Sequence, residues 1–110
     1  MAKKKQKIYL SGPIGDEPDM EEVKARFDLY QKHFEAEGFE VVNPLNNGVP
    51  ADASRYRHMK ADIRLLLDCD IIHLQSGWRS SPGCWCEYQV ACQCGLVSSF
   101  INLEDTIKRL

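Results

Sequence analysis

The apolar positions of this chain follow two spacings that alternate along the sequence. Short apolar runs bounded by Gly, Pro, Asn or Asp predict four strands, at residues 7–11, 39–42, 70–75 and 97–101. Between them, apolar residues recur every three or four positions and predict three helices, at residues 19–37, 54–67 and 82–94. The spacing of Leu103, Ile107 and Leu110 predicts a short closing helix. This alternation predicts an α/β fold, with a parallel sheet of about four strands and helices on both faces.

Capping residues support the expected helix boundaries. Asp19 can cap the first helix, and Glu22 three residues later completes a capping box. Ser81 is the expected N-cap of the third helix, and Gly38 and Gly95 are expected to end the first and third helices. The apolar stripe of the second helix is expected to be buried, and it consists of Tyr56, Met59, Ile63 and Leu66.

Composition is that of a single folded domain. The chain has 110 residues, of which 44% are hydrophobic and 27% charged. We expect residues 1–6 to be a disordered basic N-terminus and residues 7–110 to form one domain. The net charge of −2 favours neither a nucleic acid polymer nor a membrane surface as a partner. Without a signal peptide or a membrane-spanning run, we expect a cytoplasmic protein, and its short sheet favours a homo-oligomer or a terminal helix covering the edges.

The five cysteines are expected to be reduced thiols that bind no metal. Four of them form the pairs Cys84, Cys86 and Cys92, Cys94 on the third predicted helix. Residues two positions apart on a helix point in opposite directions, so these sulfurs cannot converge on one metal ion. The glycine pattern typical of flavin and nicotinamide sites is also missing, so we expect no cofactor.

Polar and small residues follow the carboxyl ends of two predicted strands. Ser11 is the last residue of the first strand and Gly12 and Pro13 follow it, and Trp78 lies in the loop after the third strand. Glu87 follows early in the next helix. Because open parallel sheets bind ligands at this edge, these five residues are candidates for a common site.

Several of these residues also have a purely structural interpretation. Glu87 alone would simply complement the positive end of a helix dipole. Trp78 could stack on a ligand or plug the sheet edge, and Ser81 with the Gly83 amide could bind an anion or only cap the helix. Arg79 could pair with a phosphate or remain solvated.

Three further titratable groups have structural explanations. His58 and Asp62 lie one turn apart and, on spacing alone, form a surface pair. His73 lies in an apolar strand and is expected to be a core residue.

Two segments resemble a known enzyme family. Residues 8–13, Ile-Tyr-Leu-Ser-Gly-Pro, resemble the opening of nucleoside 2-deoxyribosyltransferases, and Asp62 and its spacing to Asp70 resemble their second half. Residues 77–95 follow the pattern Gly-Trp-x-x-Ser-x-Gly-x-x-x-Glu-x-x-x-Ala-x-x-x-Gly. This pattern most closely resembles that of a family of small uncharacterised domains related to those transferases. The resemblance covers nearly the whole chain and implies a flavodoxin-like sheet.

The resemblance also implies roles for individual residues. Glu87 would be the nucleophile, Asp62 would face the nucleobase and help protonate it, and Tyr9 would line the site near the nucleophile. An acid usually binds the sugar in the transferases at the position of Ser81. The related deoxynucleoside monophosphate hydrolases have Ser there beside a phosphate, but they carry Ser and Arg in the first turn where this chain has Pro13 and Gly15.

The sequence therefore predicts an enzyme that cleaves or exchanges the N-glycosidic bond of a nucleoside or nucleotide. A carboxylate can capture the sugar carbon as an ester while a second acid protonates the departing base. One alternative is a non-catalytic nucleotide-binding or sensing module, which is favoured if Asp62 lies far from Glu87. A further alternative is a phosphoribohydrolase, suggested by Pro82, Gly83 and Glu87. The sequence leaves the nucleobase, the sugar, the phosphorylation state and the choice between hydrolysis and transfer open.

Overall fold

The computed structural model describes residues 4–104 and contains a four-stranded sheet. Its strands are β1 (Lys7–Ser11), β2 (Glu40–Val42), β3 (Ile71–Leu74) and β4 (Val97–Ser99). The α-helices are α1 (Met20–Ala36), α2 (Arg55–Leu67) and α3 (Pro82–Gln93), and short 3₁₀ turns occupy Pro44–Asn46 and Trp78–Ser80. The predicted strands and helices between residues 7 and 101 are confirmed within two residues at each end, and the first 3₁₀ turn lies between the second predicted strand and the second predicted helix. The closing helix lies almost entirely outside the described residues, as do residues 1–3 of the predicted N-terminal segment.

All neighbouring strands are parallel, and their order across the sheet is β2-β1-β3-β4. This order is that of a flavodoxin-like fold, so the predicted fold class is confirmed. Within the sheet, β2 lies on one side of β1, and the chain then crosses over to place β3 on the other side of β1. Ligands of such folds bind where the strand order reverses, which here is the carboxyl edge between β1 and β3.

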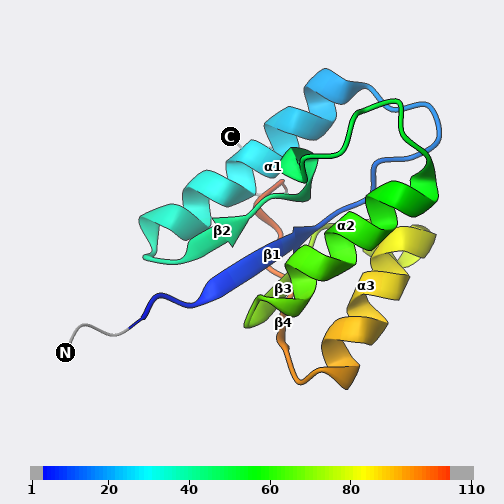
Figure 1. Cartoon of the computed structure of the whole chain (residues 1–110). Coiled ribbons are helices and arrows are strands. Elements are labelled where there is room, and N and C mark those ends of the chain that lie inside the picture. Colours follow the sequence, from blue (N-terminus) through cyan, green and yellow to red (C-terminus); the bar gives the residue numbers. More distant parts are fainter. Residues whose placement is uncertain (1–3, 105–110) are drawn as a thin grey trace.

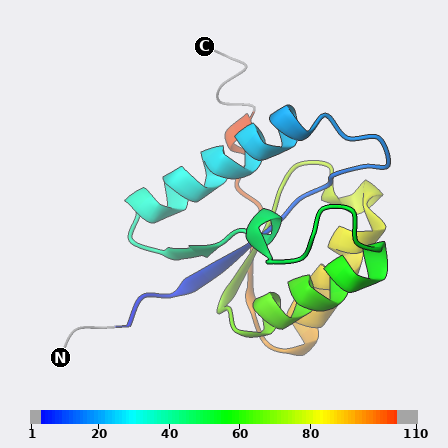
Figure 2. The same ribbon diagram turned by 45° about the horizontal axis from the view of Figure 1, so that its top comes forward.

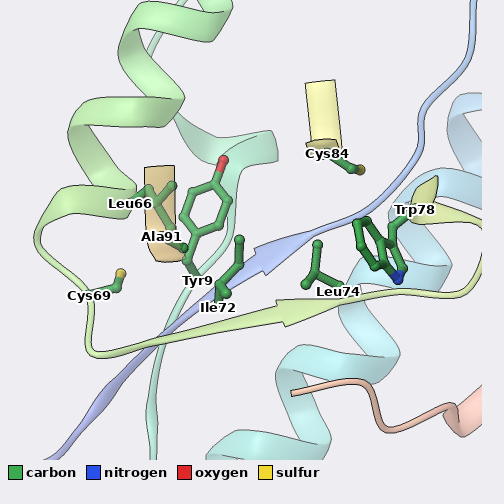
Figure 3. Close-up of a cluster of buried hydrophobic side chains, with 8 residues drawn as sticks. All are labelled: Tyr9, Leu66, Cys69, Ile72, Leu74, Trp78, Cys84 and Ala91. Carbon is green, nitrogen blue, oxygen red and sulfur yellow. The ribbon is translucent and has the colours of Figure 1, made fainter. Parts of the chain in front are cut away.

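Helices cover both faces of the sheet, with α1 on one face and α2 and α3 side by side on the other (Figures 1 and 2). Alternate residues of β1 point to opposite faces and enter two different clusters. Ile8 and Leu10 pack with α1, through Val23, Phe27, Tyr30 and Phe34. Tyr9 packs with α2 and α3, in a cluster that also contains Leu66, Cys69, Ile72, Leu74, Trp78, Cys84 and Ala91 (Figure 3).

The predicted caps are present in the structure. The Asp19 carboxylate accepts hydrogen bonds from the backbone amides of Glu21 and Glu22, and the Ser81 hydroxyl accepts one from the amide of Cys84. Gly38 and Gly95 follow α1 and α3 with φ of +95° and +78°, in the left-handed region that glycine adopts most readily.

One member of the predicted stripe of α2 is not buried. The side chain of Tyr56 is 75% exposed, whereas Leu66 is fully buried and Met59 and Ile63 are half-buried. Tyr56 belongs to the first turn of α2, which extends past the carboxyl ends of the strands (Figure 1). Periodicity identifies the face of a helix, but it does not show how far the neighbouring sheet reaches.

Other expectations concern the core and the cysteines. His73 is fully buried, as predicted, and its Nδ1 lies 3.1 Å from the hydroxyl of Ser99. Burial lowers the pKa of His73 to about 4, so the ring is neutral. All five cysteines are free thiols, and residues 4–104 contain no group of three or more potential metal ligands. No helix in the same range is long and apolar enough to cross a membrane.

Candidate active site

The carboxylate of Glu87 lies against the end of β1. Glu87 is in the second turn of α3, and its side chain points inward, leaving the residue only 7% exposed. The Ser11 hydroxyl donates a hydrogen bond of 2.9 Å to Oε1, and the Tyr9 hydroxyl donates one to Oε2. Both carboxylate oxygens are therefore held by side chains of β1 at the switch point of the sheet.

The surroundings of Glu87 favour its protonated form at mildly acidic pH. Burial raises the pKa of Glu87 from 4.5 to about 7, because a buried charge loses its hydration. The hydrogen bonds from Tyr9 and Ser11 lower this pKa, and the negative charge of Asp62 raises it. At neutral pH the group therefore exists in both ionised and protonated forms in comparable amounts.

Tyr9 is a neutral hydrogen-bond donor in this site. Burial raises the pKa of Tyr9 well above its usual value, and the negative charges of Glu87 and Asp62 raise it further. Its ring stands in the cluster beneath α2 and α3, and its hydroxyl points away from the end of the sheet where Cys69 lies (Figure 3). This orientation brings the hydroxyl to Glu87.

Asp62 on α2 is the second acid near Glu87. Its charge raises the pKa values of both Glu87 and Tyr9, so the carboxylate lies within electrostatic reach of the pair. Asn47 donates a hydrogen bond of 2.8 Å to Asp62 and lies 3.2 Å from Nδ1 of His58. Burial raises the pKa of Asp62, while the Asn47 hydrogen bond and His58 lower it. The expected surface pair of His58 and Asp62 is thus part of a half-buried network bridged by Asn47.

Arg26 connects three elements around the loop after β1, although the sequence patterns predict no role for it. Its side chain is 9% exposed and donates hydrogen bonds of 2.7 Å to Oε1 of Gln75 and 2.5 Å to the carbonyl of Pro13. Gly12 is the residue that fits here, because a Cβ atom at this position would lie 2.5 Å from the Gln75 amide. Arg26, Gln75 and Gly12 together fix the loop that follows Ser11.

One sequence signal could have identified Arg26. The apolar stripe of α1 contains Val23 and Tyr30, and Arg26 lies three residues after the first and four before the second. A cation in such a position is on the buried side of the helix and needs polar partners. Asn47 offers no comparable signal, because polar residues in loops are usually solvated.

A family model for a domain of unknown function, DUF4406, matches residues 6–100. The chain belongs to the DUF4406 family. Comparison with curated proteins gave no match.

Among solved structures, this DUF4406 domain is similar to a 2-deoxyribosyltransferase from Leishmania mexicana. The TM-score is 0.68 and the sequence identity 18%, with the match covering 88% of this chain and 64% of that chain. At this identity the likeness concerns the fold. The expected relationship of a small uncharacterised domain to the deoxyribosyltransferase fold is confirmed.

The other candidate residues of the DUF4406 domain have identifiable structural contacts. Trp78 is 9% exposed, and its ring lies 4.9 Å from the rings of both Trp85 and Tyr88. Gly83 allows α2 and α3 to approach, because a Cβ atom there would lie 3.3 Å from the methyl group of Met59. Ser81 caps α3. Arg79 places its guanidinium 5.5 Å from the ring of Trp78.

Two surface depressions lie near these residues, and neither is lined by Glu87. One of about 270 Å³ is formed by Leu74, Ser76, Gly77, Trp78, Arg79, Phe100 and Asn102. Another of about 540 Å³ is formed by Asn47, Val49, Arg57, Lys60, Ala61, Arg64 and Leu65. Trp78 and Asn47 therefore border open space, whereas the carboxylate of Glu87 is enclosed.

Proposed function

We propose that this domain cleaves the N-glycosidic bond of a nucleoside or nucleotide, with Glu87 as the nucleophile. The observation that carries the proposal is a buried carboxylate whose two oxygens accept hydrogen bonds from Tyr9 and Ser11. Its position at the strand-order switch is where this class of sheet binds ligands. The structurally similar protein from Leishmania mexicana is a 2-deoxyribosyltransferase, which favours the same substrate class.

The proposed first step forms an ester between Glu87 and the sugar. An oxygen of the ionised carboxylate bonds to the anomeric carbon while the carbon–nitrogen bond breaks and its electron pair moves to the base. Asp62 supplies the proton that this nitrogen takes up. In the second step, water or another base attacks the anomeric carbon and releases Glu87 as a carboxylate, and the attacking group returns its proton to Asp62.

Tyr9 and Ser11 would orient the nucleophile in this mechanism. Their two hydrogen bonds fix the plane of the carboxylate and stabilise its ionised form against the effect of burial. The remaining candidate contacts to substrate come from Gly12 and Pro13 in the first loop and from Trp78, Ser81 and Gly83 around the start of α3.

The reactive form of the site carries one proton shared between two acids. Glu87 must be ionised to attack, and Asp62 must be protonated to donate. The rate should fall at low pH, where both acids are protonated, and at high pH, where both are ionised. A bell-shaped pH profile is expected, and its two limbs belong to the pair of acids together.

A non-catalytic nucleotide-binding module is the alternative, and one observation favours it. Glu87 is 7% exposed and lines neither open depression, so a substrate reaches it only if the surrounding loops move. Catalysis therefore needs a path to this carboxylate that neither depression provides, whereas binding at Trp78 or Asn47 does not.

A substrate panel separates these two functions. Deoxynucleosides, ribonucleosides and their 5′-monophosphates are incubated with the protein, with and without an acceptor base, and released bases are measured by chromatography. We expect base release by the wild type, no release by Glu87→Ala, and unchanged release by Glu35→Ala, which removes an exposed acid from α1. If the wild type releases no base from any substrate but calorimetry detects nucleotide binding, the binding module is correct.

A further inference from the structure

The segment from α3 to the end of β4 differs in charge from the rest of the chain. Residues 83–103 contain one charged side chain, that of Glu87, and it is buried. The chain as a whole has 27% charged residues. Surface helices normally carry charged or polar residues on their outer side. The outer sides of α1 and α2 do so, with residues such as Lys24, Lys32, Arg57 and Lys60.

The outer side of α3 forms a continuous uncharged surface. Besides Pro82 at the start of the helix, its exposed residues are Trp85, Cys86, Gln89, Cys92 and Gln93, and we call these five together with Phe100, which lies beyond β4, the α3 face. Ring contacts join its two parts, since Tyr88 lies 5.9 Å from the ring of Trp85 and 6.3 Å from that of Phe100. Trp85 is 39% exposed and Phe100 51%. No element within residues 4–104 covers the outer side of α3 (Figures 1 and 2).

We propose that the α3 face binds a second copy of this chain and forms a symmetric dimer. Two copies that each carry a net charge of −2 repel one another, and the repulsion is smallest where neither surface bears a charge. In a twofold interface the same patch meets itself, with residue i of one copy against residue j of the other, so each charge on the patch must be matched by an opposite charge across the axis. The six residues of the α3 face meet this requirement because they carry no charge, and the exposed Arg79, whose carbonyl accepts a hydrogen bond from Trp85, lies at the edge of the face. Its aromatic residues and lack of charge are also typical of interface cores.

The cysteines provide independent support for a covered surface. Three thiols, those of Cys86, Cys92 and Cys94, are free and exposed in the single chain, and the first two lie on the α3 face. Exposed thiols are vulnerable to oxidation and are uncommon on isolated domains. A second copy seated on α3 would shield both sulfurs from solvent. The proposed dimer does not depend on the enzymatic activity proposed above.

A single isosteric substitution tests the interface. Gln89 is exposed, and its side chain makes no hydrogen bond within the described part of the chain, so Gln89→Glu adds a charge without changing shape. Burying two such charges should raise the dimer dissociation constant by about 30-fold or more. Trp85→Glu should have the same effect, whereas Tyr56→Glu, which places a charge at a residue 75% exposed on α2, should leave the dissociation constant unchanged.

Sedimentation velocity over a range of concentrations gives these constants, and circular dichroism confirms that each variant is folded. Alkylation followed by peptide mass mapping provides the second readout. Cys86 and Cys92 should react about tenfold more slowly in the wild-type dimer than in Gln89→Glu at the same concentration. A wild-type protein that remains monomeric at about 100 μM overturns the proposal. The proposal is also overturned if the dimer dissociation constants of Gln89→Glu and Trp85→Glu equal that of Tyr56→Glu. The interface would then lie elsewhere or involve another partner.

Discussion

Replacing Glu87 by glutamine should stabilise the fold at alkaline pH. The unfolded chain releases the Glu87 proton near pH 4.5, whereas the folded protein retains it up to about pH 7. Between these values unfolding releases a proton, so rising pH favours unfolding. The destabilisation by the ionised group is absent below about pH 4.5 and complete above about pH 7. The Glu87→Gln variant has no ionisable group at this position and therefore avoids the effect.

The magnitude follows from the difference between the two pKa values. The pKa rises from 4.5 to about 7, and at about 1.4 kcal/mol per pKa unit the ionised carboxylate destabilises the fold by about 3 kcal/mol. A glutamine amide fits the same hydrogen bonds, because its oxygen accepts from Tyr9 and its nitrogen can donate to Ser11. Most of this free energy should therefore be recovered in the variant.

Urea unfolding followed by circular dichroism measures the effect. At about pH 8.5 the variant should be more stable by about 2–3 kcal/mol, which shifts the midpoint by about 1–3 M urea. At about pH 4.5 the two proteins should have nearly equal stability. Glu35→Gln, which neutralises an exposed acid on α1, should show no comparable pH dependence. A stability difference between wild type and Glu87→Gln that stays constant across this pH range would show that ionisation of buried Glu87 does not destabilise the fold.

Three other substitutions test the site. Asp62→Asn should lower the rate of base release by roughly 10²–10⁴-fold, because the departing base loses its proton donor, as initial rates would show. Tyr9→Phe removes a hydrogen bond that lowers the pKa of Glu87, so the carboxyl ¹³C signal of Glu87 should titrate with a midpoint above that of the wild type. Gly12→Ala should destabilise the fold by about 1–3 kcal/mol in urea unfolding, because the new Cβ overlaps the Gln75 amide. Unchanged rates, titration midpoint or urea midpoint would contradict the respective assignments.

The fold was predictable because each element carries several consistent local signals. The capping residues Asp19 and Ser81 and the terminal glycines Gly38 and Gly95 agree with the apolar periodicity between them. The strand order was not predictable from these signals, since periodicity assigns elements and does not pair strands. Tyr56 shows the same limit in α2, where the apolar spacing continues past the edge of the sheet.

The residues of the candidate site were predictable only where their position relative to a strand end determines where they lie in the fold. Glu87 follows a strand end closely, so the topology alone brings it to the carboxyl edge of the sheet. Arg26, Asn47 and Gln75 act through contacts between distant segments, such as the 2.7 Å hydrogen bond from Arg26 to Gln75 across 49 residues of sequence. Such contacts depend on how far α1 and the loops extend over the sheet. Sequence spacing within one element does not contain that information.

The stability and the reactivity of this site should respond to pH in opposite directions through one carboxylate. Ionisation of Glu87 destabilises the fold because the charge is buried, and the same ionisation would create the proposed nucleophile. In Asp62→Asn the second acid is absent, so the residual rate should rise with pH as Glu87 ionises. The charge of Asp62 raises the pKa of Glu87, so Glu87 should ionise at a lower pH in this variant than in the wild type. The folding stability of that variant should fall over the same pH interval. The rate should level off at the pH where the stability stops falling, because the pKa of Glu87 in the folded variant sets both upper limits. A rate that keeps rising well above that pH would show that the reactive group is not Glu87.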